Sequence, residues 1–216
     1  MERVLPGTRL GEWVISQLPP PPARILEIGC GNGRLARALD RAGYDVVAVD
    51  PEAPIGRIFR RCLIEDFDEP KKFHAAVASL SLHHVDDLSY TLEKIRGLLR
   101  PQARLVVNEF AFDRLDPATA RWFFSRRKRL PAGRRRRFAA RSPEAFLKKW
   151  KRTFRDIYGS HSLRRSLDRR FRTRLFAWTP YFFYYPGGIV REPTERRLIE
   201  RGVIRAIGFR YVGIRK

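Results

Sequence analysis

Three alternate glycines mark the segment whose residue types and spacing are best suited to bind a ligand. Residues 27–33 read Glu-Ile-Gly-Cys-Gly-Asn-Gly and follow a short apolar run at 24–28. Glycines allow a sharp turn and a close approach of the backbone to a ligand, and the helix expected at 34–41 presents free N–H groups to polar or anionic atoms. A tight turn alone does not require three alternate glycines, so the segment predicts a nucleotide-like ligand.

The spacing of these glycines departs from the fingerprint of dinucleotide-binding proteins. That fingerprint needs glycines at positions 29, 31 and 34, whereas position 34 is Arg and the third glycine is Gly33. The departure weakens an interpretation as an NAD-binding loop.

Two adjacent histidines, His83 and His84, are the strongest candidates for acid–base chemistry. They follow the apolar run at 75–79, which predicts a strand, and open parallel sheets bind ligands at the carboxyl ends of their strands. Neighbouring side chains diverge, so at most one of the two faces an acceptor, and a packing role for either is the alternative. His161, farther along the chain, ranks behind His84 as a catalytic candidate, and His74 precedes the strand at the opposite edge.

The elements that position these residues follow from the hydrophobic pattern. Short apolar runs predict strands at 24–28, 45–50, 75–79 and 105–108, and amphipathic spacing predicts helices at 8–17, 34–41 and 86–99. Alternating strands and helices favour right-handed crossovers and a mostly parallel sheet covered on both faces. At the end of the chain, residues 195–201 predict a short helix, and 203–207 with 209–214 predict an antiparallel hairpin.

The charge of the chain is concentrated in its second half. The first 110 residues contain 15 Lys and Arg and 15 Asp and Glu, whereas residues 111–216 contain 30 basic and 8 acidic residues and therefore carry the whole net charge of +22. An Arg-rich coding bias would act along the entire chain and does not explain this asymmetry. The second half is therefore expected to favour an anionic partner.

The region at 111–194 shows no strand pattern and predicts a helical lid over the binding edge of the sheet. Helices are expected at 142–158, where Ser142 and Pro143 form a typical helix start, and at 162–177. Basic clusters occur at 126–129 and 134–137, and aromatic residues gather at 122–124 and 176–185. Aromatic rings among cations suit nucleic acid, whereas an aromatic pocket suits a small or isoprenoid-like acceptor. For most of these residues the simplest interpretation is a lid core with a solvated basic face.

Several classes of protein are disfavoured by the composition. No apolar run approaches the roughly 18 residues of a membrane span, and the N-terminus lacks a secretory signal, so a cytoplasmic location is expected. Cys30 and Cys62 are too few for a disulfide framework and lack zinc-site spacing, so no metal is expected.

The glycine loop resembles motif I of the class I S-adenosylmethionine-dependent methyltransferases, an acid followed by Gly-x-Gly-x-Gly after the first strand. In that family the acid at the end of the second strand holds the ribose hydroxyls, and the matching residue is Asp50. A helix cap at Asp50, which Pro51 fits, is compatible with that role.

Three further segments strengthen the resemblance. Residues 64–67, Ile-Glu-Asp-Phe, match the place where the family contacts the adenine, and residues 78–87 are similar to the fourth-strand segment of its ubiquinone-methyltransferase-like branch. Residues 97–107 are similar to the lead into strand five, with Gln102 and Ala103 in place of two glycines. The Asn-Pro-Pro-Tyr type of segment that accompanies methylation of base amino groups is absent.

The resemblance implies S-adenosylmethionine as the cofactor. It assigns cofactor binding to Glu27, Gly29, Cys30, Gly31, Gly33, Asp50, Pro51, Glu65, Asp66, Phe67 and Ser79.

The resulting prediction is an α/β fold with a Rossmann-like, doubly wound, mostly parallel seven-stranded sheet, an antiparallel C-terminal hairpin and a helical lid insert. The expected division is an N-terminal helix and proline linker at 1–22, a cofactor-binding core at 23–110, the insert at 111–194, and the last helix and hairpin at 195–216. The predicted function is methyl transfer to a small-molecule acceptor, anionic or aromatic, bound under the lid. The alternatives are an RNA methyltransferase that uses the basic insert and a non-catalytic basic nucleic-acid-binding protein that keeps the fold.

Overall fold

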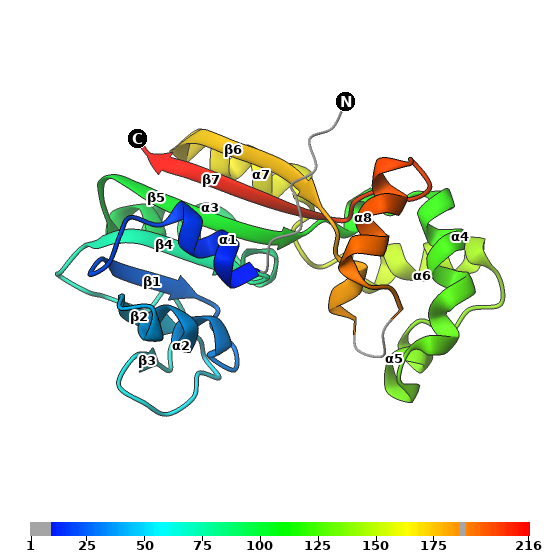
Figure 1. The fold of residues 1–216 in the computed structure, drawn as a ribbon, viewed down its shortest axis with the longest axis horizontal. Coiled ribbons are helices and arrows are strands. Elements are labelled where there is room, and N and C mark those ends of the chain that lie inside the picture. Colours follow the sequence, from blue (N-terminus) through cyan, green and yellow to red (C-terminus); the bar gives the residue numbers. More distant parts are fainter. Residues whose placement is uncertain (1–9, 186–188) are drawn as a thin grey trace. The chain divides into compact units, whose positions relative to one another are not determined.

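The chain forms two compact units in a computed structural model that describes residues 10–185 and 189–216 (Figure 1). The first, called here the α/β unit, contains residues 10–109, 161–176 and 210–216. The second, called the insert unit, contains the described residues of 110–160 and 177–209. Thr8, the predicted start of the first helix, lies outside the described residues.

Seven strands form one sheet in the order β3-β2-β1-β4-β5-β7-β6. The pairs β1–β2, β1–β4, β2–β3 and β4–β5 are parallel. The strands are β1 Arg24–Ile28, β2 Asp45–Val49, β3 Phe59–Arg60, β4 Phe73–Ser79, β5 Leu99–Phe110, β6 Phe171–Thr179 and β7 Gly208–Arg215. All of β1 and most of β2 and β4 are buried, as expected for parallel strands covered on both faces.

The last strand, β7, runs antiparallel to β5 (Figure 1). Arg215, at the end of β7, donates a hydrogen bond to the carbonyl of Leu99 at the start of β5. Just beyond the other ends of the two strands, the N–H of Ala111 donates to the carbonyl of Ile207 at 2.8 Å. The predicted doubly wound, mostly parallel seven-stranded sheet with an antiparallel C-terminal end is therefore confirmed.

Two local predictions at this end of the sheet are wrong. Residues 203–207 form no strand, and β7 pairs instead with β6, which lies inside the region predicted to lack strands. Residues 162–177 were expected as one helix, but the helix α7 Ser160–Arg170 ends where β6 begins. Residues 171–179 contain aromatic and β-branched residues that favour a strand, but polar and apolar residues do not alternate along them, so the hydrophobic pattern does not signal β6.

The three helices in the first half of the α/β unit lie close to their predicted ranges. Asp87 is the N-cap of α3 Leu88–Leu98, and its carboxylate accepts hydrogen bonds from the N–H groups of Ser89 and Tyr90 at 2.8 and 3.0 Å. The other two helices of the first half are α1 Leu10–Gln17 and α2 Arg34–Arg41. Within the described residues, no helix is long and apolar enough to cross a membrane.

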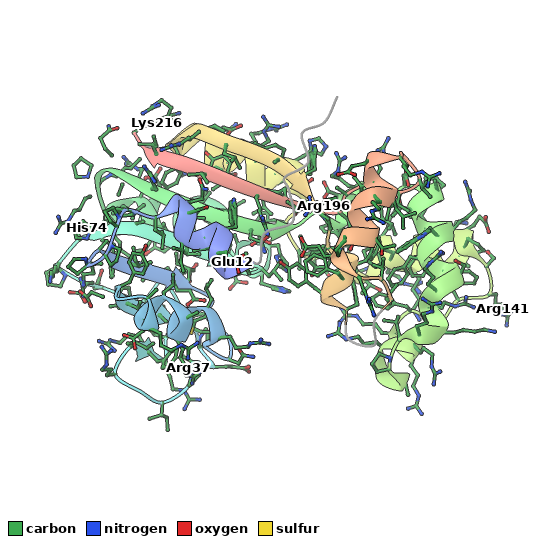
Figure 2. All side chains as sticks on the ribbon, viewed as in Figure 1. Glu12, Arg37, His74, Arg141, Arg196 and Lys216 are labelled. Carbon is green, nitrogen blue, oxygen red and sulfur yellow. The ribbon has the colours of Figure 1, made fainter. Side chains whose placement is uncertain are left out.

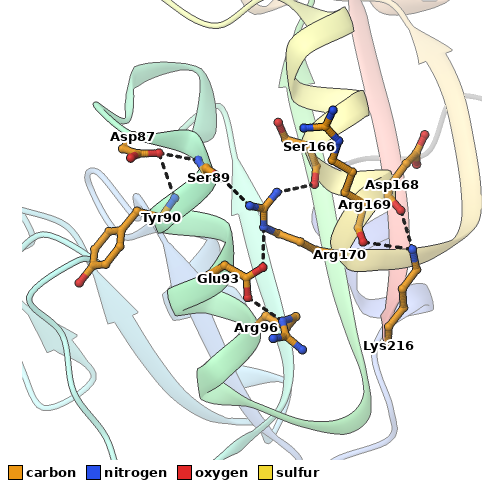
Figure 3. A network of polar contacts seen from close by, with 10 residues as sticks. All are labelled: Asp87, Ser89, Tyr90, Glu93, Arg96, Ser166, Asp168, Arg169, Arg170 and Lys216. Carbon is orange, nitrogen blue, oxygen red and sulfur yellow. Dashed lines mark hydrogen bonds and ion pairs between the residues drawn. The ribbon is translucent and has the colours of Figure 1, made fainter.

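Helix α7 is held to α3 and β7 by a network of charged side chains (Figure 3). Arg170 forms an ion pair with Glu93 of α3 at 2.9 Å and donates to the hydroxyl of Ser89. Lys216 donates to the last carbonyl groups of α7, at Asp168 and Arg169. These contacts explain why residues 161–176 belong to the α/β unit, although they were expected in the insert.

The insert unit is a set of short helices around an aromatic core. Its helices are α4 Pro117–Arg126, α5 Ala132–Arg137, α6 Pro143–Thr153 and α8 Glu192–Glu200. As predicted, Ser142 caps α6, but the helix ends at Thr153 and not at residue 158. The rings of Phe123, Phe138, Phe146 and Trp150 are buried against one another, with centroids 5.2 to 6.1 Å apart. These rings are the core of the unit.

Candidate functional site

The glycine loop joins β1 to α2 and leaves open space beside Gly31. Its backbone is held by the carbonyl of Val49, which accepts from the N–H groups of Gly29 and Cys30 at 2.8 and 3.3 Å. A Cβ at Gly29 would lie 2.2 Å from the Cβ of Ser81, so only glycine fits there. Gly31 has φ +49°, and a Cβ at this residue would meet no protein atom within 4 Å. The loop is therefore tightly packed at its first glycine and open at its second.

Asp50 follows β2 and closes the loop from the neighbouring strand. Its carboxylate accepts hydrogen bonds from the N–H of Gly31 at 2.9 Å and from the N–H of Glu52 at 2.7 Å. The second contact closes a turn of the Asx type, and no helix follows Asp50 in the described structure, so the predicted helix cap is wrong. Because a carboxylate accepts about four hydrogen bonds, Asp50 can also accept from ligand hydroxyls.

Glu27 is the least satisfied polar side chain of this region. It lies on β1 between Ala48 of β2 and Val77 of β4, is 3% exposed, and its Oε2 has no hydrogen-bond partner among the described residues. Burial, and to a lesser extent the charge of Asp50, raise the pKa of Glu27 to about 8. Burial and then the charges of Glu27 and Asp50 raise the pKa of the Cys30 thiol to about 12, so Cys30 is not an activated nucleophile.

These features fit S-adenosylmethionine, which the sequence resemblance implies. The open space at Gly31 admits a ligand to the backbone. Asp50 offers acceptors for ribose hydroxyls, and the unpartnered oxygen of Glu27 offers an acceptor for a cationic amino group. Gly33 is the N-cap of α2, and Pro51 is exposed beside Asp50, so the structure brings the motif I residues and Asp50 to one edge.

The other residues assigned to the cofactor lie in a turn and at the end of β4. Phe67 is buried and packs near Phe73 with ring centroids 6.4 Å apart, whereas Asp66 is exposed. Glu65 accepts a hydrogen bond from the hydroxyl of Thr91. Ser79, the last residue of β4, accepts from the side-chain amide of Asn108 at 3.3 Å. Their cofactor contacts stay predictions.

Glu109, near the carboxyl end of β5, organises the histidine segment after β4. One carboxylate oxygen accepts from the N–H groups of Ser81 and Leu82 at 3.0 and 2.7 Å, and the other lies 2.5 Å from Nδ1 of His83. Glu109 and His83 are 1% and 5% exposed. The hydroxyl of Ser81 also donates to the carbonyl of Ile28, which ties this segment to the glycine loop.

The three predicted catalytic histidines have different surroundings. His83 is buried against Glu109, and His84 is exposed, with its ring centroid 4.1 Å from that of His83. His161 lies in the first turn of α7 and lines a hollow together with Arg164, Arg165, Asp168 and Arg169 of the same helix. His74 accepts a hydrogen bond from the N–H of Arg24 near the start of β1, as expected for a structural residue at the other edge.

Glu109 and Ser81 are the residues that the sequence interpretation missed. The available signal was a charged residue that ends a strongly apolar strand, because a carboxylate in that position needs hydrogen-bond donors. Those donors lie 26 to 28 residues earlier in the chain, so only the parallel pairing of β4 with β5 reveals them.

Comparison with known proteins connects this site to a family. Residues 7–174 match the family described as "Methyltransferase domain", which is more than half of the chain. The curated relatives include ubiquinone biosynthesis O-methyltransferases from Xylella fastidiosa, 32% identical over 112 residues, and from Bradyrhizobium diazoefficiens, 29% identical over 98 residues. These matches cover 45% and 39% of this chain, and 46% and 39% of the respective relatives. The match therefore spans less than half the length of these relatives.

Solved structures show the same fold at low sequence identity. An S-adenosylmethionine-dependent methyltransferase from Mesorhizobium loti superposes with a TM-score of 0.58 and 18% identity, over 95% of this chain and 98% of that one. The N-methyltransferase NodS from Bradyrhizobium japonicum, solved with S-adenosylhomocysteine, superposes with a TM-score of 0.52 and 11% identity, over 89% and 78% of the two chains.

Proposed function

The chain belongs to the methyltransferase domain family and is an S-adenosylmethionine-dependent methyltransferase, and from this premise we propose that it methylates an oxygen atom of a small-molecule acceptor. The choice of oxygen rests on the relatives named as O-methyltransferases. The non-catalytic alternative is not retained. A cytoplasmic location stays a prediction.

The observation that carries the proposal is the pairing of an open loop with an unpartnered buried carboxylate. Gly31 leaves room at the backbone, and Glu27 and Asp50 place two carboxyl groups at the same loop. Bound S-adenosylmethionine supplies an electrophilic methyl group on a sulfonium. Glu27 would hold the amino group of the cofactor and Asp50 its ribose, because both are acceptors with remaining capacity.

The protein's own contribution to transfer is orientation and proton acceptance. An in-line displacement needs the acceptor atom held about 3 Å from the methyl carbon and water excluded. We assign His84 as the residue that accepts the hydroxyl proton, because it is exposed at the carboxyl end of β4. His83 is then a positioning residue, since its Nδ1 is bound to the buried carboxylate of Glu109. His161 is the reserve candidate for the base.

Aromatic residues of the insert unit suggest the class of acceptor. Phe110, the last residue of β5, stacks on Tyr181 with ring centroids 4.3 Å apart and an angle of 18°. The half-buried rings of Phe112 and Phe154 also lie beside Phe110, with ring centroids 6.1 and 5.1 Å from that of Phe110. Partly exposed rings favour a planar or isoprenoid-like acceptor. The covering of that acceptor by the insert stays a prediction.

The test is methyl transfer from labelled S-adenosylmethionine to hydroxylated aromatic compounds, with and without an isoprenoid tail. We expect His84→Ala to lower kcat while cofactor affinity, measured by calorimetry, is unchanged. His161→Ala tests the reserve candidate, and a loss of kcat in this variant alone would make His161 the base. Failure to bind S-adenosylmethionine would remove the proposal entirely, and an equal loss of kcat in both variants would remove the assignment of the base.

A further inference from the structure

The helices from α4 to α6, residues 117–153, carry an unusually one-sided charge. This stretch, called here the basic segment, contains 14 Lys and Arg residues and one acidic residue, Glu144. The first 110 residues of the same chain have equal numbers of basic and acidic residues, so a general preference for Arg does not account for the segment. Self-repulsion among these cations costs stability, which an anionic partner would offset.

Part of the segment forms a groove between the end of α4 and α5. The groove has a volume of about 400 Å³ and is lined by Arg127, Lys128, Arg135 and Arg136 together with three alanines. The alanines, at 132, 139 and 140, are small and leave room between the cations. Four positive groups therefore surround one hollow.

The cations of the groove are available to a ligand to different degrees. Arg127 is engaged, because it donates to the carbonyl of Phe124 at 2.6 Å and lies 3.4 Å above the ring of Phe124. Lys128, Arg135 and Arg136 are exposed, and among the described residues their side chains form no ion pair. Lys149 donates to the carbonyls of Arg136 and Ala139 and so fixes the end of α5 beside the groove.

Charge continues beyond the groove onto the loop and helix that follow. Arg141 points outward from the loop between α5 and α6 (Figure 2), and α6 adds Lys148, Lys151 and Arg152, all exposed. A small anion would neutralise the groove alone and leave these groups unpaired. A polymer with regularly spaced negative charges can contact both regions.

The side chains around the groove indicate which phosphate-bearing partner it fits, a nucleic acid or a lipid surface. Trp122, Phe123, Phe138, Phe146 and Trp150 are buried, and the half-buried ring of Phe124 is covered by the guanidinium of Arg127, so the rings of the segment offer no open platform for stacking bases. The exposed large apolar side chains of the described protein, at positions 15, 55, 63, 90 and 203, all lie outside the basic segment, so it has no anchor to insert into a bilayer. These absences favour recognition of a phosphate backbone rather than of bases or of lipid.

We propose that the basic segment is a docking surface for the phosphodiester backbone of a nucleic acid, with the groove at Lys128, Arg135 and Arg136 as its centre. One Arg guanidinium group can donate two parallel hydrogen bonds to two oxygens of a phosphate, and this binding needs no contact with a base. Docking is independent of base sequence and equal for RNA and DNA duplexes of the same length. The inference does not rest on the proposed function, so its failure would leave that function untouched.

The experiment measures binding of the full chain to a mixed-sequence RNA duplex of about 20 base pairs as salt is raised from about 0.05 to 0.2 M. The test variant is Lys128→Gln with Arg135→Gln and Arg136→Gln. The matched control is Lys72→Gln with Arg41→Gln and Arg61→Gln, which removes the same charge from exposed positions of the α/β unit. We expect the test variant to bind roughly tenfold more weakly or worse, and the slope of its salt dependence to fall by up to about 0.9 for each phosphate that the protein no longer neutralises. The control should behave like the parent.

Three outcomes would overturn the proposal. Equal weakening in both variants would mean that only the net charge matters. No duplex binding by the parent at about 0.1 M salt would mean that the segment is a solvated face. Binding to vesicles of phosphatidylglycerol that the test variant loses, without duplex binding, would identify a lipid surface instead. Unchanged calorimetric binding of S-adenosylmethionine shows that the test variant is folded.

Discussion

Glu27 in the α/β unit and Glu195 in the insert unit are both buried carboxyl groups, but their hydrogen-bond partners differ. Burial raises the pKa of Glu27 to about 8 and that of Glu195 to about 7. Glu195 accepts from the N–H groups of Tyr181, Phe182 and Phe183 at 2.7 to 2.9 Å, which oppose the rise in its pKa. Glu27 has an oxygen without any partner.

The difference separates a structural carboxylate from one that awaits a ligand. An unsatisfied buried acceptor costs about 1 to 3 kcal/mol, so its retention needs a compensating gain. For Glu195 the gain is the turn η4 Phe182–Tyr184, whose N–H groups it satisfies. For Glu27 no such gain lies within the described part of the chain, and we expect a bound cationic group to supply it. Substitutions at four residues test this difference, and they follow in order of decreasing expected effect on cofactor affinity.

Gly31→Val should have the largest effect. The substitution places a branched side chain in the open space of the loop at φ +49°. We expect the affinity for S-adenosylmethionine, measured by calorimetry, to fall by roughly a hundredfold or more, about 2.7 kcal/mol. Gly202→Val is the matched control, because Gly202 has φ +68° and equally open surroundings outside the site. Both variants should lose stability through backbone strain, and equal cofactor affinity in the two would place the ligand elsewhere.

Asp50→Ala should have the next largest effect. The variant loses the carboxylate that holds the N–H of Gly31 and that would accept the ribose hydroxyls. A hydrogen bond to a charged group is worth about 1.5 to 3 kcal/mol, so we expect roughly tenfold weaker binding or more. Glu52→Ala, at an exposed neighbouring position, is the control and should bind as the parent does. Unchanged affinity for Asp50→Ala in a folded protein would contradict the site.

The raised pKa of Glu27 gives a prediction about pH. Because its folded pKa is about 8 instead of 4.5, Glu27 is protonated in the free protein at neutral pH, and the stability associated with protonation is lost as pH rises through about 8. A cationic ligand favours the carboxylate, so binding near pH 7 should release up to about one proton. The affinity should therefore rise by up to about tenfold for each unit by which the pH is raised, until the pH reaches about 8. Calorimetry in buffers of different ionisation enthalpy measures the released protons. Glu27→Gln should abolish the release; a release that persists in this variant would assign it to another group.

The cofactor edge could be predicted from the sequence because its parts are local. The glycine loop, the acid at the end of β2 and the cap at Asp87 each lie within a few residues of the element they serve. Glu109 and Glu27 show the limit of that reasoning. The sequence identifies Glu27 by motif, but only burial between β2 and β4 reveals its orphaned oxygen, and only strand pairing reveals the partners of Glu109.

The insert was predicted less well because its structure depends on distant contacts. Strand β6 forms because β7, some thirty residues later, pairs with it, and neither segment signals its partner. The aromatic residues of 122–124 could have lined a pocket or a core, and the burial of Phe123 against Phe138 and Phe146 is a property of the assembled unit. Glu195 was expected only as the start of a helix, and its role in holding residues 181–183 crosses a loop.

Glu195→Gln should leave cofactor affinity unchanged and lower stability, which is the reverse of Glu27→Gln. The amide keeps one acceptor for Tyr181 and Phe182 but turns a donor toward the N–H of Phe183, so one buried hydrogen bond is lost. We expect a loss of about 1 to 3 kcal/mol, or roughly 2 to 4 °C in Tm for each kcal/mol in a protein of this size. In Glu27→Gln no hydrogen bond of Oε2 is lost, and folding near pH 7 no longer requires protonation of a buried carboxylate, so stability should stay equal or rise while cofactor affinity falls. Thermal denaturation and calorimetry on the two variants measure both quantities side by side. If Glu27→Gln proves as destabilising as Glu195→Gln and binds the cofactor as the parent does, then Glu27 is a structural carboxylate like Glu195, and an unpartnered oxygen at the glycine loop is no evidence for the ligand.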